Sequence, residues 1–480
     1  MTKIRKIAKN TTLLLVSQIV SYALGFLYVM YSAHYLGAEG FGILSFALGF
    51  AGILGIVADF GLSQLTVREV ARDKSLSNKF LGNALTIKVL LAISILLFTT
   101  MMIIFKNYSP EITYVLYFIV LYNILIAYSQ IFYATFQAYE KMEYQAIGTV
   151  LMATIILIGT LIAIYSKWDV VGFASVYLIA SLLTFIYTFI ICIWKFFLPK
   201  IEFDIGFLKP TLKEAWPFGI TGILVMLYTY IDTVMLSFMQ GNEVVGWYNA
   251  AYRLIMVLLF IPVAINIAVY PVMSQFYVSS RDSLKLIYEK IFKFMLILGL
   301  PIGVGTTILA EKIILLIFGT GYTQSIIALQ ILIWTIVLTF ASAAFLRLFE
   351  SINKQLIITK ISVITVLINI ILNLILIPKF SYVGSSFATV ITELILMTTL
   401  FAVSYKIGYG IPLKKFLKDM TKIIAASIFM GIFLWHFESF NWIIAMISAV
   451  ILYFGVLYVF KILDEEDMLL IKQVIKLVKK

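Results

Sequence analysis

Long apolar runs follow one another along almost the whole of this 480-residue chain. Stretches such as 81–105 and 440–460 have the length of roughly 20 residues that an α-helix needs to cross the hydrocarbon core of a bilayer. The chain is 62% hydrophobic and only 12% charged, so it has too little polar surface to enclose these runs in a water-soluble core. Leu, Ile and Phe fill the runs without the strict alternation of a membrane β-barrel. The sequence therefore predicts an all-α integral membrane protein.

The runs predict about fourteen transmembrane helices. The expected spans are 11–33, 42–67, 81–105, 113–138, 146–165, 172–194, 214–239, 246–273, 291–310, 324–346, 356–378, 383–405, 419–437 and 440–460. The first span is preceded by a basic segment and is too long for the apolar core of a signal peptide, so we expect it to be retained.

The distribution of Lys and Arg supports this count. With a cytoplasmic N-terminus, 30 of the 36 basic residues fall on the cytoplasmic side, four on the opposite side and two inside spans. Such asymmetry is the positive-inside signal of multi-pass proteins. We therefore predict a protein of the cytoplasmic (inner) membrane with both termini in the cytoplasm. The net charge of +12 then indicates contact with anionic lipids and no nucleic-acid partner.

One loop pattern occurs twice, 204 positions apart. Gly37-x-Glu39-x-x-Gly42 recurs as Gly241-x-Glu243-x-x-Gly246. We expect Gly37, Gly40 and Gly42 to permit positive φ in a tight turn, and the glutamates to lie near helix starts, where negative charge is favourable.

Further pairs recur at offsets of 210 and 212, including Glu140 with Glu350 and Gly172 with Gly384. The order of these matches predicts two parallel-repeat six-helix lobes around a central cavity, a common construction of transporters. The predicted divisions are 1–204 for the N-lobe, 205–405 for the C-lobe, and 406–480 for two extra helices and a tail. The tail from Asp464 predicts a short amphipathic helix on the cytoplasmic membrane surface.

Cofactor motifs are missing from the sequence. The single cysteine, Cys192, lies in an apolar run, and His34 and His436 are far apart with no carboxylate cluster at ligand spacing. We expect no metal site, no bound cofactor and no direct use of ATP, because the chain has no phosphate-binding loop.

Several polar residues lie where lipid would make them costly. Charged residues within spans usually face a cavity, and Asn side chains at mid-membrane can hydrogen-bond sugar hydroxyls or neighbouring helices. We expect Asp232 and Arg253 to be close enough to pair, and the stem of Lys88 to reach the cytoplasmic headgroups. The candidate substrate-cavity residues are Asp59, Arg68, Lys88, Asp232, Arg253, Lys360, Asn369, Asn373 and Glu393.

At four stretches the sequence resembles the oligosaccharide flippases of the multidrug/oligosaccharidyl-lipid/polysaccharide (MOP) superfamily. These are YLGAEGFGILSFA (35–47), DFGLSQLTVREVAR (59–72), YIDTVMLSFMQGNEVVGWYNAAYRL (230–254) and INIILNLILIPKFSYVGSSFATVITELI (368–395). The resemblance implies translocation of a polyprenyl-diphosphate-linked oligosaccharide to the outer leaflet by alternating access, with no covalent chemistry. It carries cavity roles to Asp59, Arg68, Asp232 and Arg253. Coupling to H⁺ or Na⁺, and partners among other polysaccharide-assembly membrane proteins, remain open.

Three alternatives are weighed against this interpretation. An ion-coupled multidrug or cation antiporter of the same superfamily would need a smaller, more acidic pocket. A lipid II-type flippase is a narrower form of the preferred function. A membrane glycosyltransferase or polymerase would need acidic motifs on a sizeable outer loop, whereas the predicted outer loops here are short, so we expect no enzyme.

Overall fold

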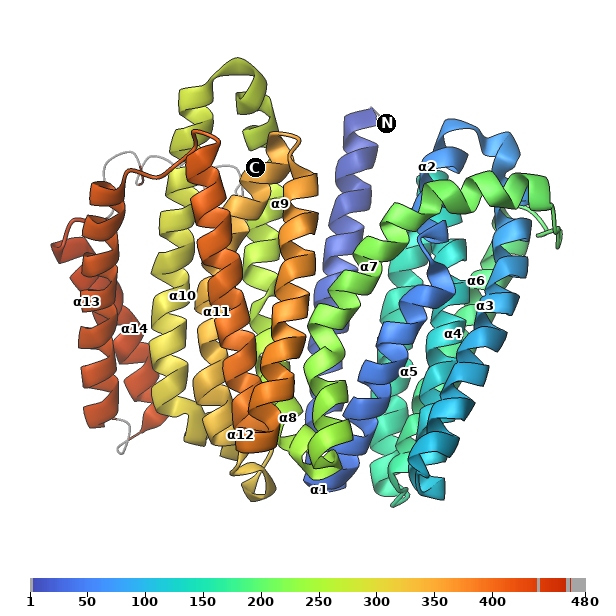
Figure 1. Ribbon diagram of the computed structural model, residues 1–480, viewed down its shortest axis with the longest axis horizontal. Helices are drawn as coiled ribbons and strands as arrows, with labels where there is room; N and C mark the ends of the chain where they lie inside the picture. The colour runs from blue at the N-terminus through green and yellow to red at the C-terminus, as the bar shows by residue number, and fades with distance from the viewer. Residues whose placement is uncertain (1–2, 438–440, 463–466, 468–480) are drawn as a thin grey trace. The chain divides into compact units, whose positions relative to one another are not determined.

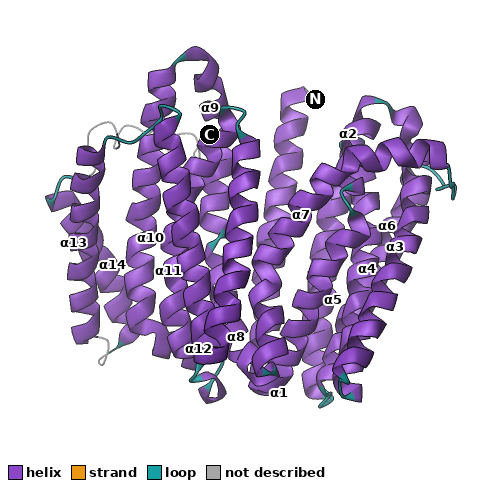
Figure 2. Cartoon of the chain, viewed as in Figure 1, coloured by secondary structure: helices purple, strands orange, loops and turns teal. Residues whose placement is uncertain are grey.

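The computed structural model describes residues 3–437, 441–462 and 467, and this part of the chain is helical with short turns (Figures 1 and 2). The main helices are α1 (Lys3–Asp59), α2 (Leu62–Arg72), α3 (Ser77–Lys106), α4 (Pro110–Ala138), α5 (Met142–Tyr165), α6 (Val170–Lys195), α7 (Ile205–Gln240), α8 (Asn242–Leu258), α9 (Phe260–Ser279), α10 (Arg281–Ile317), α11 (Ser325–Ser351), α12 (Gln355–Lys406), α13 (Leu413–Phe437) and α14 (Trp442–Val459). Two short 3₁₀ turns, Lys74–Leu76 and Thr320–Tyr322, complete the described elements.

The described helices include twelve segments that are long and apolar enough to cross a membrane. Two of them, Lys9–Arg72 and Gln355–Lys406, are 64 and 52 residues long. Each contains an interruption, at Gly37 (φ 67°) and at Ser381 (φ 53°), and each is long enough for two spans. The all-α membrane fold is thereby confirmed, and counting the interrupted helices as two spans each matches the predicted number.

The predicted eighth span, 246–273, is interrupted after Leu258. Helix α8 ends at Leu258 and α9 begins at Phe260. Pro262 lies in the first turn of α9 and has no amide proton to donate to the carbonyl of Leu258, so an unbroken helix would lose this hydrogen bond. The chain therefore changes helix at this point.

The chain divides into two compact units, Met1–Asn249 and Ala250–Lys480. Helix α7, which we expected to open the C-lobe, packs against α1 and α2 and belongs to the first unit. The predicted lobe boundaries at residues 204 and 405 were drawn from the repeated sequence pattern, and they stay a prediction. The compact units and the repeat are different divisions of the chain.

The two copies of the repeated loop contact each other inside the first unit. A Cβ atom on Gly42 would meet the carbonyl oxygen of Asn242 and lie 2.9 Å from the amide nitrogen of Gly246. A Cβ atom on Gly246 would in turn meet the carbonyl oxygen of Ala38. Only glycine permits backbones to approach this closely. The repetition of the motif therefore reflects a shared packing surface.

The expected turn chemistry holds for only one of the three glycines in the first loop. Gly37 has a positive φ, as does its counterpart Gly241 at 98°, whereas Gly40 and Gly42 do not. The prediction of positive φ at those two positions is wrong, because the helix resumes directly after Gly37. Glu243 lies in the first turn of α8, as expected for a residue near a helix start.

The second unit is built around α10. This helix packs against α11 on one side and against α13 and α14, the two helices outside the repeat (Figure 1). The hydroxyl of Tyr453, on α14, donates to the carbonyl oxygen of Ile297, on α10, at 2.8 Å. A buried polar contact of this kind fixes the extra helices in one position along α10.

Candidate functional site

A buried ion pair lies in the first unit, where α1 ends. The backbone leaves the helix through Phe60 (φ 44°) and Gly61 (φ 78°), and this break places Asp59 beside the start of α2. The Asp59 carboxylate accepts hydrogen bonds from the amide and hydroxyl of Ser63, the latter at 2.5 Å. From α3, the ammonium group of Lys88 lies 2.6 Å from Asp59 Oδ1 and also donates to the carbonyl oxygen of Ala58 at 3.3 Å.

The expectation that Lys88 reaches the cytoplasmic headgroups is wrong. The Lys88 side chain is only 1% exposed, and that of Asp59 is 17% exposed. An unpaired ammonium group at this depth would be strongly destabilising, and the Asp59 carboxylate provides the opposite charge. The sequence identified both residues as buried charges but gave no signal that they would pair, since 29 positions separate them.

Arg68 lies on α2 and is about one third exposed. Its guanidinium is paired with Glu69 on the same helix, at 2.6 Å, and with Glu214 on α7. The predicted cavity role of Arg68 remains untested, and the observed contacts join α2 to α7.

Asp232 and Arg253 lie in different units. Asp232, on α7, is buried, and its carboxylate accepts a hydrogen bond from the hydroxyl of Tyr248 at 2.8 Å. Arg253, on α8, is half-buried, and its Nε atom has no hydrogen-bond partner among the described residues. The pairing of Asp232 with Arg253 stays a prediction.

The other candidates all lie on α12, in the second unit. Asn369 and Asn373 are buried one helical turn apart, and the Asn373 amide donates to both oxygens of Asn369 at 3.1 Å. Glu393 is buried beyond the interruption at Ser381, whereas Lys360 is exposed. The structure thus brings together two pairs of candidates, Asp59 with Lys88 and Asn369 with Asn373, and the central cavity stays a prediction.

A second charge cluster, which the sequence did not predict, lies in the second unit. Lys290 and Lys293, on α10, have side chains that are 4% and 9% exposed. Their ammonium groups lie 2.8 and 2.6 Å from the carboxylate of Asp467, which is fully buried. Both lysines belong to the 30 basic residues that we expected on the cytoplasmic side. Their spacing of three residues within an apolar helix was the available signal. The rest of the predicted amphipathic tail lies outside the described residues.

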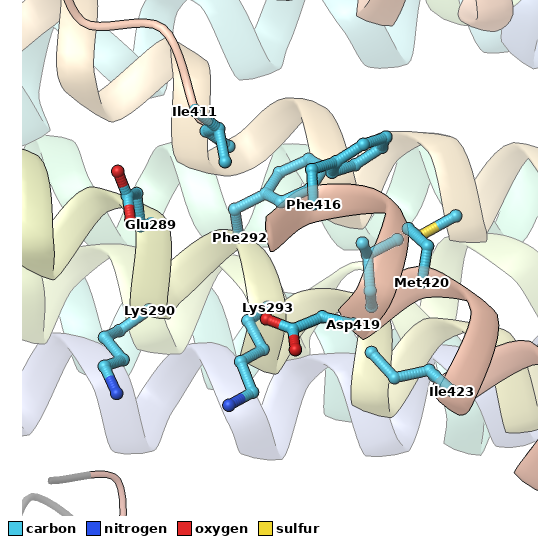
Figure 3. Close-up of a pocket in the computed structure, with 10 residues that line it drawn as sticks. Glu289, Lys290, Phe292, Lys293, Ile411, Phe416, Asp419, Met420 and Ile423 are labelled. Atoms are coloured by element: carbon cyan, nitrogen blue, oxygen red, sulfur yellow. The ribbon is translucent and has the colours of Figure 1, made fainter. Parts of the chain in front are cut away.

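The stems of these lysines line a narrow slot in the second unit (Figure 3). Phe292 and Leu296 of α10 face Phe416 and Met420 of α13 across it. In Figure 3 the two ammonium groups extend to the same side, away from the aromatic rings. Glu289 and Asp419 also line the slot, and the two lysine ammonium groups reach Asp467.

A charged contact outside the spans fixes the start of α7. The Asp204 carboxylate caps this helix by accepting from the amide of Phe207 at 3.1 Å, and it lies 3.1 Å from the ammonium group of Lys79. The hydrogen bond from Lys79, followed by that from Phe207, lowers the pKa of Asp204 below its ordinary value. The amide of Asp204 also donates to Asn83 at 2.8 Å. The linker before α7 is thereby held against α3.

Among the described residues, no group of three or more His, Cys, Asp or Glu side chains could hold a metal ion. Cys192 is free and buried.

The chain matches two models of known protein families. The family model described as "Polysaccharide biosynthesis protein" matches residues 7–277, which is more than half of the chain. A second model, described as "MatE", matches residues 217–375. The two matches overlap across α7, α8 and α9.

Individual relatives are similar over most of the chain. A candidate O-antigen transporter of Shigella dysenteriae is 27% identical over 66% of this chain and 79% of its own length. A protein of Haloferax volcanii named as a low-salt glycan biosynthesis flippase, Agl15, is 23% identical over 80% and 81% of the two chains. The solved lipid II flippase MurJ, in an inward closed conformation, shares the fold with a TM-score of 0.78 at 20% identity, covering 94% of this chain and 98% of its own. The predicted resemblance to the MOP superfamily is thus confirmed, and the chain belongs to the polysaccharide biosynthesis protein family.

Proposed function

We propose that this protein is a flippase that moves a lipid-linked oligosaccharide from the cytoplasmic to the outer leaflet by alternating access. The observation that carries the proposal is the similarity to proteins named as flippases, over 80% of the chain in sequence and 94% in fold. The chain is a multi-pass membrane protein of a transporter family, and we assign it no covalent chemistry. The substrate passes between leaflets without a bond being formed or broken.

The paired charges support this assignment on physical grounds. Charged groups inside a membrane protein are costly, and those retained usually line a pathway for polar or charged cargo. A diphosphate headgroup can be held by Lys and Arg, while carboxylates such as Asp59 balance those cations when no substrate is bound. The buried amides of Asn369 and Asn373 offer hydrogen bonds suited to sugar hydroxyls.

Coupling to H⁺ or Na⁺ is part of the proposal, as are cytoplasmic termini in the inner membrane and contact with other polysaccharide-assembly membrane proteins. Asp59, Asp232 and Glu393 are the carboxylates among the candidate residues. Replacement of Asp232 with Asn is expected to weaken transport and shift its dependence on pH or sodium. If the Asp232→Asn variant transports with unchanged ion dependence, Asp232 has only a structural role, as the hydrogen-bond acceptor of Tyr248.

The decisive experiment uses purified protein in sealed liposomes that contain a lipid-linked oligosaccharide. A membrane-impermeant glycosidase reports the fraction of sugar exposed over time. We expect protein-dependent exposure, and we expect Arg253→Ala to abolish it while the protein stays folded and inserted. The matched control is Lys167→Ala, at an exposed position between α5 and α6. Normal transport by the Arg253 variant would remove this residue from the cavity.

An ion-coupled multidrug antiporter is the second candidate, favoured by the match of residues 217–375 to the MatE model. The same liposomes distinguish it. Saturable movement of an organic cation along an imposed H⁺ or Na⁺ gradient, without exposure of the sugar, would support the antiporter. A lipid II substrate tested in parallel with an oligosaccharide donor would separate the narrower flippase from the preferred one.

A further inference from the structure

A polar pocket that the proposed function does not use lies inside the first unit. It has a volume of about 70 Å³ and is lined by residues of α4, α5 and α6. Met152 and Ile126 are its apolar members, and Gln130 is its exposed one. Its polar lining consists of Ser129, Gln130, Tyr133, Thr149, Ser181 and Thr184.

The hydroxyl groups around this pocket act mainly as acceptors. Those of Ser129, Thr149, Ser181 and Thr184 donate their protons to backbone carbonyl oxygens of their own helices, at 2.8 to 3.0 Å. Each hydroxyl oxygen still has lone pairs that can accept a hydrogen bond. The pocket therefore offers several acceptors inside a membrane-spanning bundle.

Tyr133 gives a second, independent indication that the pocket binds a small polar ligand. Its side chain lines the pocket, the residue is 5% exposed, and its hydroxyl has no hydrogen-bond partner among the described residues. The hydroxyl lies against α5, at a place where a Cβ atom on Gly148 would meet it. A buried hydroxyl without a partner is costly and needs a ligand or water to satisfy it.

We propose that this pocket is a hydration site, because its volume exceeds the ~10–15 Å³ that is needed to hold one water molecule. Water donates protons to the hydroxyl oxygens and accepts the proton of Tyr133. None of the lining residues is a carboxylate, so the site does not suit a divalent cation.

The position of the pocket along α4 defines how far the water lies from the turn between α4 and α5. Gln137 and Gln145 are hydrogen-bonded at 2.9 Å next to the turn between α4 and α5. Tyr133 and Gln130 follow on the same face of α4, four and seven residues further into the span. At 1.5 Å per residue, Tyr133 and Gln130 lie about 6 and 10 Å along the helix from Gln137.

X-ray radiolytic labelling of the whole protein in lipid nanodiscs tests the proposal, because bound water produces hydroxyl radicals next to the side chains that it contacts. Two tyrosines serve as matched controls, since both are buried and have hydroxyl partners. Tyr382 is 8% exposed and bonded to Gln324, and Tyr453 is 1% exposed and bonded to Ile297. We expect Tyr133 to be modified at least about threefold faster than either.

The comparison with Tyr382 controls for bulk water, because that residue is more exposed than Tyr133. Equal modification rates at the three tyrosines would mean that the pocket is dry, and the proposal would fail. The conservative variant Tyr133→Phe removes the hydroxyl that would bind water. The oxidation rate of Met152, which also lines the pocket, reports whether the water is still present. We expect oxidation of Met152 to fall severalfold in Tyr133→Phe, and unchanged oxidation would overturn the role of Tyr133 in holding the water. The labelling needs no substrate, so failure of the proposed transport would leave its result intact.

Discussion

At the scale of single residues, the ion pair between Lys88 and Asp59 is the most constrained feature of the candidate site. Because Lys88 is almost completely buried and Asp59 keeps partial access to solvent, the two single replacements should differ. Asp59→Asn leaves a buried ammonium group unpaired, and we expect it to lower the free energy of unfolding by about 3–5 kcal/mol. Lys88→Met should cost less. Unfolding in detergent measures both.

The double variant Asp59→Asn with Lys88→Met is the control for this pair. Removing both charges eliminates the unpaired ion, so we expect stability to recover towards that of the natural protein. Strictly additive losses would mean that the two side chains do not interact. Transport measured on the same stable double variant then asks whether the charges serve the substrate or only the fold.

Asp204 carries the pH dependence that the structure allows us to predict. Its pKa is lowered by Lys79 and by the Phe207 amide, so its stabilising contribution is present above the unfolded pKa of about 4. That contribution is lost as the pH falls through the lower pKa of the folded state. We expect the melting temperatures of the natural protein and Asp204→Asn to differ at pH 7 and to converge below about pH 4. A gap that widens on acidification would contradict this.

At the scale of elements, the repeated loops depend on close contact between two backbones. We expect Gly42→Ala and Gly246→Ala each to destabilise the protein by about 1–3 kcal/mol or more, because the new methyl group would overlap a carbonyl oxygen. Gly25→Ala is the matched control on α1, since its nearest neighbour is 3.8 Å away. Thermal unfolding of the three variants measures the difference. Equal melting temperatures would show that the loops are not in contact.

At the scale of the whole molecule, the charge asymmetry predicts which loops face the cytoplasm. Lys167 and Lys200 flank α6, which at 26 residues is about 39 Å long and therefore spans the bilayer. In intact cells we expect a cysteine introduced at position 167 to react with a membrane-impermeant maleimide, and one at position 200 to react only after lysis. The buried Cys192 is expected to stay unlabelled in both. The opposite pattern would invert the topology.

Much of this architecture follows from the sequence because hydropathy acts locally. A run of about 20 apolar residues prefers a helix in lipid whatever the rest of the chain does. The spans could therefore be predicted, whereas the loop repeat, the charge asymmetry and the motifs that carry the family resemblance are visible in the sequence itself. Pro262 indicates a bend in the eighth span, but the sequence does not decide between a kink and a break, because a proline within a span can produce either.

The sequence by itself determined that the chain is an all-α membrane protein with repeated loops and buried charges. Only the tertiary structure decided that Lys88 pairs with Asp59, that Lys290 and Lys293 meet Asp467, and that the two repeated loops pack on each other. The physical reason is that burial of a charge can be read from its neighbours along the chain. The identity of its partner depends on contacts between helices that are distant in sequence, and hydropathy carries no record of those contacts.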